Sequence, residues 1–264
     1  SDVDDTIICS LKDKACKSSH KKKYWLPKRE IYPGALTLQK ELARIGANGL
    51  YSTPPLGLLL LSARFIGPLI SEAYKKGVIP KAAKKAGWKV DGIMHGTFLK
   101  DQLKNIASNE NRYIALGNRK FLNFNALIGQ GCKSKPLAQG CVWTDKKTSF
   151  VFFGDTGEGD ELAGSQMLSY KQTKNHIFVV MIHCLEKCQN KKDSRRYYYY
   201  KNYAEATQKL LLNGFIGRES ANKVLLSIST NKHYKSCQTR YKNIEGCRNL
   251  NQSMKELSQL IQGF

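Results

Sequence analysis

Two aspartates one residue apart stand in the opening segment, Ser-Asp-Val-Asp-Asp-Thr. Alternate side chains of an extended segment point the same way, so Asp2 and Asp4 can face one pocket. One carboxylate can attack phosphorus and carry the phosphoryl group, while a second protonates the leaving oxygen and then activates water. Carboxylates this close repel each other unless a cation lies between them, which suggests Mg²⁺. A solvated acidic turn would give the same pattern, so the interpretation depends on matching residues elsewhere.

Three further segments carry groups that could complete such a site. The apolar run 58–61 ends in Ser62, and the run 150–153 ends in Gly-Asp-Thr-Gly-Glu-Gly-Asp at 154–160. Wholly apolar runs are typical of strands buried in a parallel sheet, and open α/β sheets bind ligands at the carboxyl ends of their strands. Lys120 stands near the start of a helical pattern, where the helix dipole does not favour a cation, which suggests another purpose.

The order of these parts resembles the four motifs of the haloacid dehalogenase phosphohydrolase superfamily. Finer features are similar to the catalytic domain of the actin-patch type of phosphatidate phosphatase, a relative of the lipins. These are Ser-Asp-Val-Asp-Asp-Thr, Tyr-Pro-Gly at 32–34, Gly-Asp-Thr-Gly-Glu-Gly-Asp and Tyr-Ala-Glu-Ala from 203. The resemblance covers nearly the whole chain, and its first and last motifs are the specific ones. It implies an α/β fold, a Rossmann-like three-layer sandwich with a central, mostly parallel sheet and small cap or loop insertions.

This resemblance implies a role for each principal residue of the site. Asp2 would attack phosphorus, and Asp4 would act as acid and then as base. Mg²⁺ would be held by Asp2, the backbone carbonyl of Asp4, and Asp155. Ser62 and Lys120 would stabilise negative charge on the phosphoryl oxygens.

Secondary roles fall to three further residues. Thr6 would brace the loop, Arg64 would contact phosphate, and Asp160 would orient the metal's waters or the site lysine. Arg119 and Lys100 are rival candidates for the part played by that lysine.

The same patterns predict the elements that must position these groups. Apolar residues at helical spacing indicate helices, and short apolar or aromatic runs indicate strands. We expect helices over 35–45, 121–128, 161–170, 203–212 and 219–227. We expect strands over 58–61, 93–99, 149–153, 177–182 and 197–200. Between 67 and 89 we expect two short helical pieces separated by Pro80, and after 227 a polar tail.

Length and composition favour one domain. A chain of 264 residues with 41% hydrophobic residues fits one α/β domain with insertions. We expect a single phosphatase domain over 1–264, with 9–30 and 66–100 as candidate cap or insertion segments. A strand should precede Asp2 so that this residue stands at a strand's carboxyl end, and we expect that first strand upstream of Ser1.

The charge favours anionic partners. Lysine and arginine number 43 against 21 acidic residues, a formal net charge of +22. Nucleic acid, an acidic membrane surface and a phosphorylated substrate all fit this balance, as do plain solvated lysine faces. Lysines at 21–23 and 75–89 suggest peripheral contact with anionic membranes. The tyrosines at 197–200 could stack bases, but we prefer a strand packed on a helix, and no nucleic-acid module is recognisable.

The eight cysteines fall as neighbours in sequence. The pairs are Cys9 with Cys16, Cys132 with Cys141, Cys184 with Cys188, and Cys237 with Cys247. Such spacing suits small disulfide loops in a secreted or lumenal compartment, with free thiols as the alternative. No zinc-type spacing occurs.

The function expected from all of this is Mg²⁺-dependent phosphate hydrolysis through an aspartyl phosphate. The resemblance implies that the substrate is phosphatidate and the product diacylglycerol. Three alternatives stay open: a phosphatase for a soluble phosphoester or a nucleic-acid end, a non-catalytic phosphatidate-binding module, and a basic nucleic-acid-binding protein.

Overall fold

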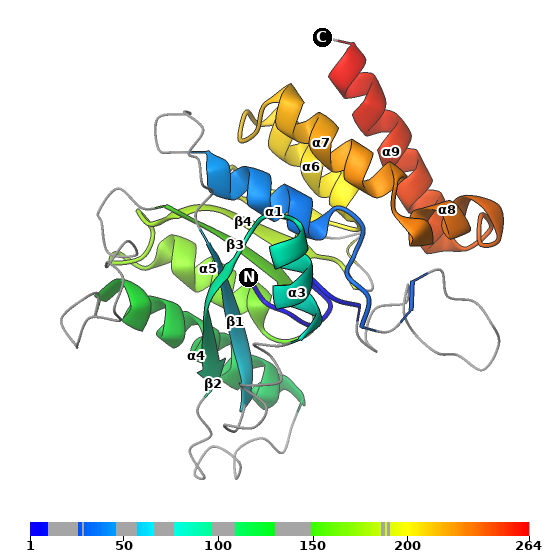
Figure 1. Ribbon diagram of the computed structural model, residues 1–264. Coiled ribbons are helices and arrows are strands. Elements are labelled where there is room, and N and C mark those ends of the chain that lie inside the picture. The colour runs from blue at the N-terminus through cyan, green and yellow to red at the C-terminus, as the bar shows by residue number, and fades with distance from the viewer. Residues whose placement is uncertain are drawn as a thin grey trace.

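The fold is seen in a computed structural model, shown as a ribbon in Figure 1. It describes residues 1–9, 26–27, 29–45, 57–65, 77–96, 109–129, 149–185, 188 and 191–263. Within these ranges the side chains of 61–65, 93–96, 109–111 and 129 are not described.

Helices alternate with strands along most of the described chain. In order they are α1 (Ala35–Arg44), β1 (Leu58–Phe65), α3 (Val78–Lys85), β2 (Val90–Gly96), α4 (Asn109–Gly129), β3 (Phe150–Asp155), α5 (Asp160–Ser169), β4 (Ile177–His183), β5 (Tyr197–Tyr200), α6 (Tyr203–Leu212), α7 (Arg218–Ser229), α8 (Lys232–Thr239) and α9 (Glu245–Gln262). This order confirms the α/β class that the sequence predicts.

The described strands form two sheets, and each pairing between neighbouring strands is parallel. Strand β1 pairs with β2 in one sheet, and β3, β4 and β5 lie in that order in the other. Parallel neighbours need a crossover between them, and α5 provides it between β3 and β4. The carboxyl ends of β3 and β4 therefore lie together, with Asp155 paired to His183.

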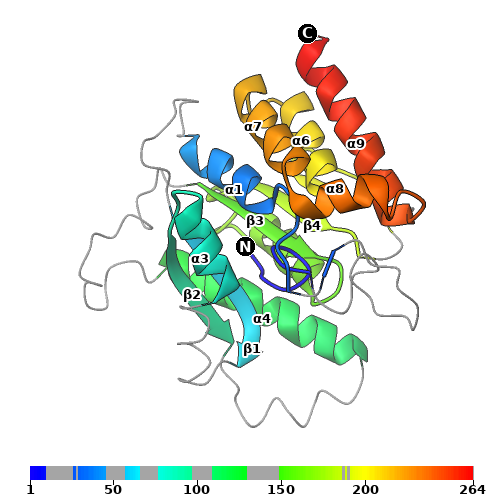
Figure 2. The same cartoon turned by 45° about the vertical axis from the view of Figure 1, so that its right-hand side comes forward.

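Helices cover both faces of the β3–β4–β5 sheet. Figures 1 and 2 show α4 and α5 on one side, and α1, α6, α7 and α9 on the other. Successive side chains of a strand point to opposite faces. Accordingly Phe152 and Val180 belong to the cluster on the α4–α5 side, whereas Phe153 and Met181 belong to the larger cluster beneath α1 and α6.

The opening residues lie between the two sheets. The Ser1 amino group donates to the Leu59 carbonyl in β1 (2.8 Å), and the Asp2 N–H donates to the Phe153 carbonyl in β3 (2.8 Å). Beyond them Val3 and Ile7 are buried in a small core with residues of β1 and α3. The opening segment therefore joins the two sheets at the place where Asp2 is held.

Several predicted elements have other boundaries. Strand β1 continues to Phe65, so Ser62 lies inside the strand rather than at its end, and β2 begins at Val90 rather than at 93. Pro80 does not break a helix, because it lies in the first turn of α3, where a missing N–H costs no intrahelical hydrogen bond. The earlier helical piece expected from 67 falls outside the described residues.

Two expectations about helices are wrong. Helix α4 begins at Asn109, so Lys120 lies in its middle and the argument from the helix dipole does not apply. The segment after 227 is not a polar tail, because it forms α8 and α9. The apolar side chains that α9 buries stand on one face of the helix: Cys247, Leu250, Met254 and Leu257.

Two of the expected cysteine pairs are disulfides, Cys184–Cys188 and Cys237–Cys247. Cys9 is also disulfide-bonded. Its expected partner Cys16 and the pair 132 and 141 lie outside the described residues. None of the helices in the described part of the chain is long and apolar enough to cross a bilayer.

Candidate active site

A tight turn presents Asp2, and contacts from distant elements hold that turn. Its backbone closes on itself, since the Ile7 and Ile8 N–H groups both donate to the Val3 carbonyl (3.0 and 3.1 Å). Asp5 adopts the left-handed region at φ 55°, a conformation that aspartate tolerates better than most residues. Asp2 itself is 3% exposed. The turn thus places the Asp2 carboxylate in the interior.

Two side chains from outside the turn, those of Tyr203 and His183, fix its carbonyl groups. The Tyr203 hydroxyl donates to the Thr6 carbonyl (2.7 Å). His183 Nδ1 lies 2.5 Å from the Asp5 carbonyl, and its Nε2 lies 3.1 Å from the Lys201 carbonyl. Each of these ring nitrogens faces an acceptor, so each bond forms when that nitrogen carries a proton. The turn is therefore braced from the end of β4 and the start of α6.

The acidic loop between β3 and α5 folds back on its own carboxylates. The Asp155 N–H donates to Asp160 Oδ2 (3.0 Å), and the Gly157 N–H donates to Asp155 Oδ1. A Cβ on Gly154 would lie 2.4 Å from the Asp160 Cβ. Glycine at this position therefore lets the Asp160 side chain pack against the end of the strand.

Helix α4 approaches this loop closely, and the approach places Lys120. A Cβ on Gly117 would lie 2.6 Å from the Gly159 carbonyl, and one on Gly159 would lie 2.5 Å from the Gly117 nitrogen. Gly159 also has φ 79°, in the left-handed region that favours glycine. Lys120 follows Gly117 by one turn and is fully buried. Its Nζ lies 2.5 Å from Asp160 Oδ1 and 3.2 Å from Asp2 Oδ1.

The result is a buried cluster with more negative than positive charge. Asp2, Asp155 and Asp160 offer carboxylate oxygens that all lie within 4.8 Å of one another. Lys120 is the described lysine that contacts two of them. When all four side chains are ionised, these groups carry a net charge of about −2, which is costly in a low-dielectric interior.

The pKa values follow from this imbalance. Burial raises the pKa of Asp160 to about 7, although Lys120 opposes the rise. Burial, and then the charges of Asp160 and Asp2, raise the pKa of Asp155 well above its usual range. Burial would lower the pKa of Lys120, but the carboxylates outweigh it, so that pKa is raised. Lys120 therefore stays protonated, while at least one carboxyl group resists ionisation.

The donor set fits a hard divalent cation. Among the described residues, the buried oxygens Asp2 Oδ2 and Asp155 Oδ2 accept no hydrogen bond. Clustered carboxylate oxygens are the ligands that Mg²⁺ and Ca²⁺ prefer. A divalent cation would both occupy the unused oxygens and offset the excess negative charge. The carboxylates alone do not fix which cation binds.

The structure brings together four of the residues predicted for the site: Asp2, Lys120, Asp155 and Asp160. Asp4 is half-buried on the same turn as Asp2. Its carboxylate is not part of the cluster, whose three carboxylates belong to Asp2, Asp155 and Asp160. Thr6 is buried, and its carbonyl anchors the turn.

Other candidates stay untested or lie elsewhere. The Ser62 and Arg64 side chains are not among those described, although their backbone lies in β1. Arg119 neighbours Lys120 on α4, and it is Lys120 that contacts the carboxylates. Lys100 lies outside the described residues.

Sequence reasoning missed the groups that hold the site in place. His183 was visible as a polar residue that ends a buried apolar strand, a position where open sheets carry functional groups. The Gly117–Gly159 approach had no local signal, because 42 positions separate the two residues.

Comparisons of this chain with protein-family models, with curated proteins and with solved structures find no match. The functional assignment therefore depends on the geometry of the site and on its motifs.

Proposed function

We propose that this protein is a metal-dependent phosphohydrolase that works through an aspartyl phosphate on Asp2. The observation that carries the proposal is the buried carboxylate of Asp2. One of its oxygens is paired to Lys120, and the other accepts no hydrogen bond from the described residues. Carboxyl groups whose pKa values are raised by burial and by charged neighbours cluster at functional sites, and Asp155 and Asp160 beside Asp2 are of this kind.

The residues would act in two steps. An oxygen of Asp2 attacks phosphorus, and the bond from phosphorus to the leaving oxygen breaks as that oxygen takes a proton from Asp4. Asp4 then takes a proton from water, the water oxygen attacks phosphorus, and the bond to Asp2 breaks. Asp4 suits this exchange because it is half-buried on the same turn and lies outside the carboxylate cluster.

Lys120 would hold Asp2 in line and stabilise negative charge on the phosphoryl oxygens. Mg²⁺, held by Asp2, Asp155 and the Asp4 carbonyl, would supply the positive charge that lets an anionic phosphate approach a carboxylate. Asp160 would orient Lys120, to which its carboxylate is closest.

We propose phosphatidate as the substrate and diacylglycerol as the product. The motif resemblance and the net charge of +22 support this choice. The proposal includes the finer fold, in which the two parallel sheets are parts of one haloacid dehalogenase-like sandwich.

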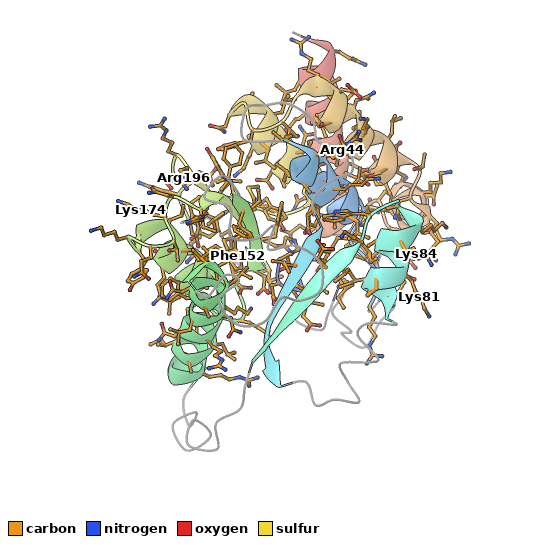
Figure 3. All side chains as sticks on the ribbon, turned by 60° about the vertical axis from the view of Figure 1, so that its left-hand side comes forward. Arg44, Lys81, Lys84, Phe152, Lys174 and Arg196 are labelled. Atoms are coloured by element: carbon orange, nitrogen blue, oxygen red, sulfur yellow. A yellow bond between two sulfur atoms is a disulfide. The ribbon has the colours of Figure 1, made fainter. Side chains whose placement is uncertain are left out.

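The described basic residues do not gather on one face. Figure 3 shows Lys81 and Lys84 projecting from α3 on one side, and Lys174 and Arg196 on the opposite side. The lysines at 21–23, 75 and 76 fall outside the described residues. Recruitment to an anionic membrane therefore remains a proposal that rests on total charge.

The test is phosphate release from phosphatidate, soluble phosphoesters and phosphorylated oligonucleotides, each with and without Mg²⁺. We expect Asp2→Asn and Asp4→Asn each to abolish Mg²⁺-dependent release from phosphatidate. Asp91→Asn is the matched control, because Asp91 pairs with Lys89 at the surface and should keep wild-type turnover.

A covalent intermediate gives a second readout. In Asp4→Asn supplied with an activated aryl phosphate, whose leaving oxygen needs no proton, the peptide that contains Asp2 should accumulate a phosphoryl group, detectable by mass spectrometry after acid quench. Near wild-type turnover in Asp2→Asn would contradict the mechanism. Preference for another phosphoester would keep the mechanism and replace the substrate.

A further inference from the structure

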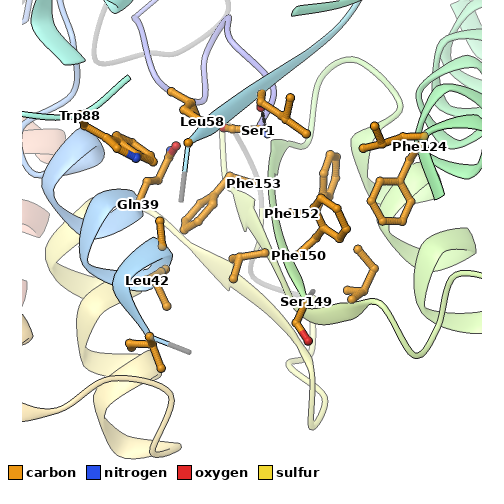
Figure 4. Close-up of a pocket in the computed structure, with 17 residues that line it drawn as sticks. Ser1, Gln39, Leu42, Leu58, Trp88, Phe124, Ser149, Phe150, Phe152 and Phe153 are labelled. Carbon is orange, nitrogen blue, oxygen red and sulfur yellow. Dashed lines mark hydrogen bonds between the residues drawn. The ribbon is translucent and has the colours of Figure 1, made fainter. Parts of the chain in front are cut away.

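Two pockets in the described part of the chain have very different linings. The pocket of Figure 4, with a volume of about 130 Å³, lies between β1 and β3, where Leu58 and Trp88 face Phe150 and Phe153. Most of the side chains that line it are apolar. The other pocket has a volume of about 630 Å³, and three cationic side chains line it: Lys174, Arg195 and Arg196. Its size is that of a small-molecule site, and it offers charge as well as shape.

This basic pocket lies at the amino-terminal edge of the β3–β4–β5 sheet. It is lined by the residue before β3, the first residues of β4, the residues that enter β5 and the turn after α6. The carboxylate cluster lies at the other edge, because Asp155 is the last residue of β3. Phe150 and Asp155 are five residues apart, which is roughly 17 Å along a strand. The basic pocket is therefore separate from the candidate active site.

The guanidinium group of Arg196 is held in place by the backbone. Its Nε donates to the Phe178 carbonyl (3.1 Å), and its Nη2 donates to the Lys174 carbonyl (2.9 Å). Figure 3 shows Lys174 and Arg196 on this edge of the molecule. Two N–H groups of the guanidinium are thus used for support, and its other N–H groups donate to no acceptor among the described residues. A guanidinium oriented in advance is well suited to bind phosphate.

The positive charge of the pocket is not neutralised by the protein. Among the described residues, no carboxylate forms an ion pair with any of its three cations. Asp193 is close in sequence, but Lys209 lies 2.7 Å from its Oδ2 and the Tyr199 N–H donates to its Oδ1 (2.9 Å). An anion in the pocket would therefore meet three unpaired cations.

The same pocket exposes an aromatic ring. Phe178 is 40% exposed, whereas the other residues of β4 are buried. Its ring meets Phe215 edge-on, with centroids 4.9 Å apart, and Phe215 meets Tyr198 in the same way at 6.0 Å. These contacts fix the ring of Phe178 and leave part of it open. A flat ring of a ligand could stack there.

We propose that this pocket binds a nucleotide, with the phosphate held by Lys174, Arg195 and Arg196 and the base stacked on Phe178. Inorganic phosphate would leave the aromatic ring uncovered, and an acyl chain would leave the cations without a partner. A nucleotide carries both an anion and a flat ring. The proposal does not depend on the phosphohydrolase function, because the pocket and the carboxylate cluster lie at opposite edges of the sheet.

The test is the binding of adenosine monophosphate to the full chain, measured by calorimetry in EDTA to prevent metal-dependent hydrolysis. Ribose 5-phosphate lacks the base, and adenosine lacks the phosphate. We expect each of them to bind at least about tenfold more weakly than adenosine monophosphate. Phe178→Leu should weaken the binding of adenosine monophosphate and leave that of ribose 5-phosphate unchanged.

Gly214 provides a matched pair of variants. It lines the pocket with φ 71°, and a Cβ there would meet no atom within 4 Å. Aspartate and asparagine both tolerate this backbone conformation and differ in charge. We expect Gly214→Asp to weaken the binding of adenosine monophosphate at least about tenfold and Gly214→Asn to change it less than about twofold. Equal Tm values for the two variants would show that both fold alike.

Three outcomes would overturn the proposal. The first is unchanged affinity for adenosine monophosphate in Gly214→Asp. The second is equal binding of adenosine monophosphate and ribose 5-phosphate. The third is that wild-type protein binds a single-stranded oligonucleotide or phosphatidylserine vesicles but not adenosine monophosphate, which would assign the cations and the ring to a larger partner.

Discussion

Asp160 and Glu161 are neighbours in the first turn of α5, and their carboxylates lie in opposite surroundings. Glu161 accepts hydrogen bonds from the hydroxyls of Tyr113 (3.2 Å) and Tyr199 (2.9 Å), and Lys191 lies 2.7 Å from it. Its charge is thus met by three donors near the surface, and the arrangement links α4, α5 and β5.

Asp160, in contrast, shares the buried Lys120 with Asp2, and both lie in one buried cluster with Asp155. Its pKa is raised, and the neighbouring Asp2 and Asp155 each keep an oxygen that accepts no hydrogen bond from the described residues. One turn of helix therefore carries a carboxylate whose charge is met near the surface and, beside it, a carboxylate that belongs to a buried cluster with excess negative charge. Asp160 and Glu161 are adjacent and carry the same functional group, so local sequence does not determine this difference. It is determined by the partners that α4 and the opening turn provide.

The largest effect is expected from removing the lysine that pairs with each of these two carboxylates, Lys120 for Asp160 and Lys191 for Glu161. Lys120→Met should lower the free energy of unfolding by about 3–5 kcal/mol, because it leaves buried carboxylates without their cation. Lys191→Met should cost at most about 1 kcal/mol, since its pair with Glu161 is partly exposed. Urea unfolding at pH 7 measures both. Equal losses of unfolding free energy in the two variants would contradict the difference between the two carboxylates.

A divalent cation should stabilise the protein through the cluster around Asp160 and not through the surroundings of Glu161. At about 100 times its dissociation constant, Mg²⁺ should raise the free energy of unfolding by about 2.7 kcal/mol. Asp155→Asn should remove most of that gain, and Glu161→Gln should keep it. Thermal unfolding with Mg²⁺ and with EDTA measures the effect. Stabilisation that survives in Asp155→Asn would place the cation elsewhere.

The pH dependence should come from the two buried carboxyl groups whose pKa values are raised, Asp160 and Asp155, and the size of the effect can be stated for Asp160. Its pKa is about 7 in the folded protein and about 4 in the unfolded chain, so the folded state binds the extra proton between these values. Stability of the metal-free protein should therefore fall by about 2 kcal/mol as pH rises from 5 to 7. Asp160→Asn should reduce this slope and leave the part that belongs to Asp155, and Glu161→Gln should leave the slope unchanged. Urea midpoints across that range give the slope, and an unchanged slope in Asp160→Asn would contradict the assignment.

The smallest effect is expected from changes around Glu161, whose carboxylate has three donors. Tyr199→Phe removes one of the donors to Glu161 and should cost about 1 kcal/mol of stability. Phosphate release should not change, because Tyr199 does not contact the cluster around Lys120. A loss of turnover with intact stability would mean that the two carboxylates are coupled.

The sequence predicted the elements whose patterns are local and complete. Apolar runs predicted β3 and β4, and helical spacing predicted α1, α5 and α6. It did not predict the beginning of α4, whose first turn, 109–112, carries no apolar residue, or α9, which buries one narrow face amid polar residues.

The residues of the site likewise divide into those that a local motif reveals and those that it does not. Acidic motifs identified Asp2, Asp155 and Asp160 because each motif brings closely spaced carboxylates together within a few residues of sequence. The supports depend on residues far apart in the chain, such as His183 against Asp5 and Gly117 against Gly159. No window of sequence contains both partners of either contact, so periodicity and turn chemistry could not reveal them.

The bond from the Tyr203 hydroxyl to the Thr6 carbonyl has a consequence for biosynthesis. Asp2 is among the first of these residues to leave the ribosome, but the group that fixes its turn is made 197 positions after Thr6. Contacts of such separation form late, since a long stretch of chain must be ordered before they are rewarded. During translation the polypeptide would pass through lengths that hold every carboxylate of the cluster and not yet the tyrosine that settles their geometry. The carboxylate cluster would thus gain its full support only after the start of α6 has been made.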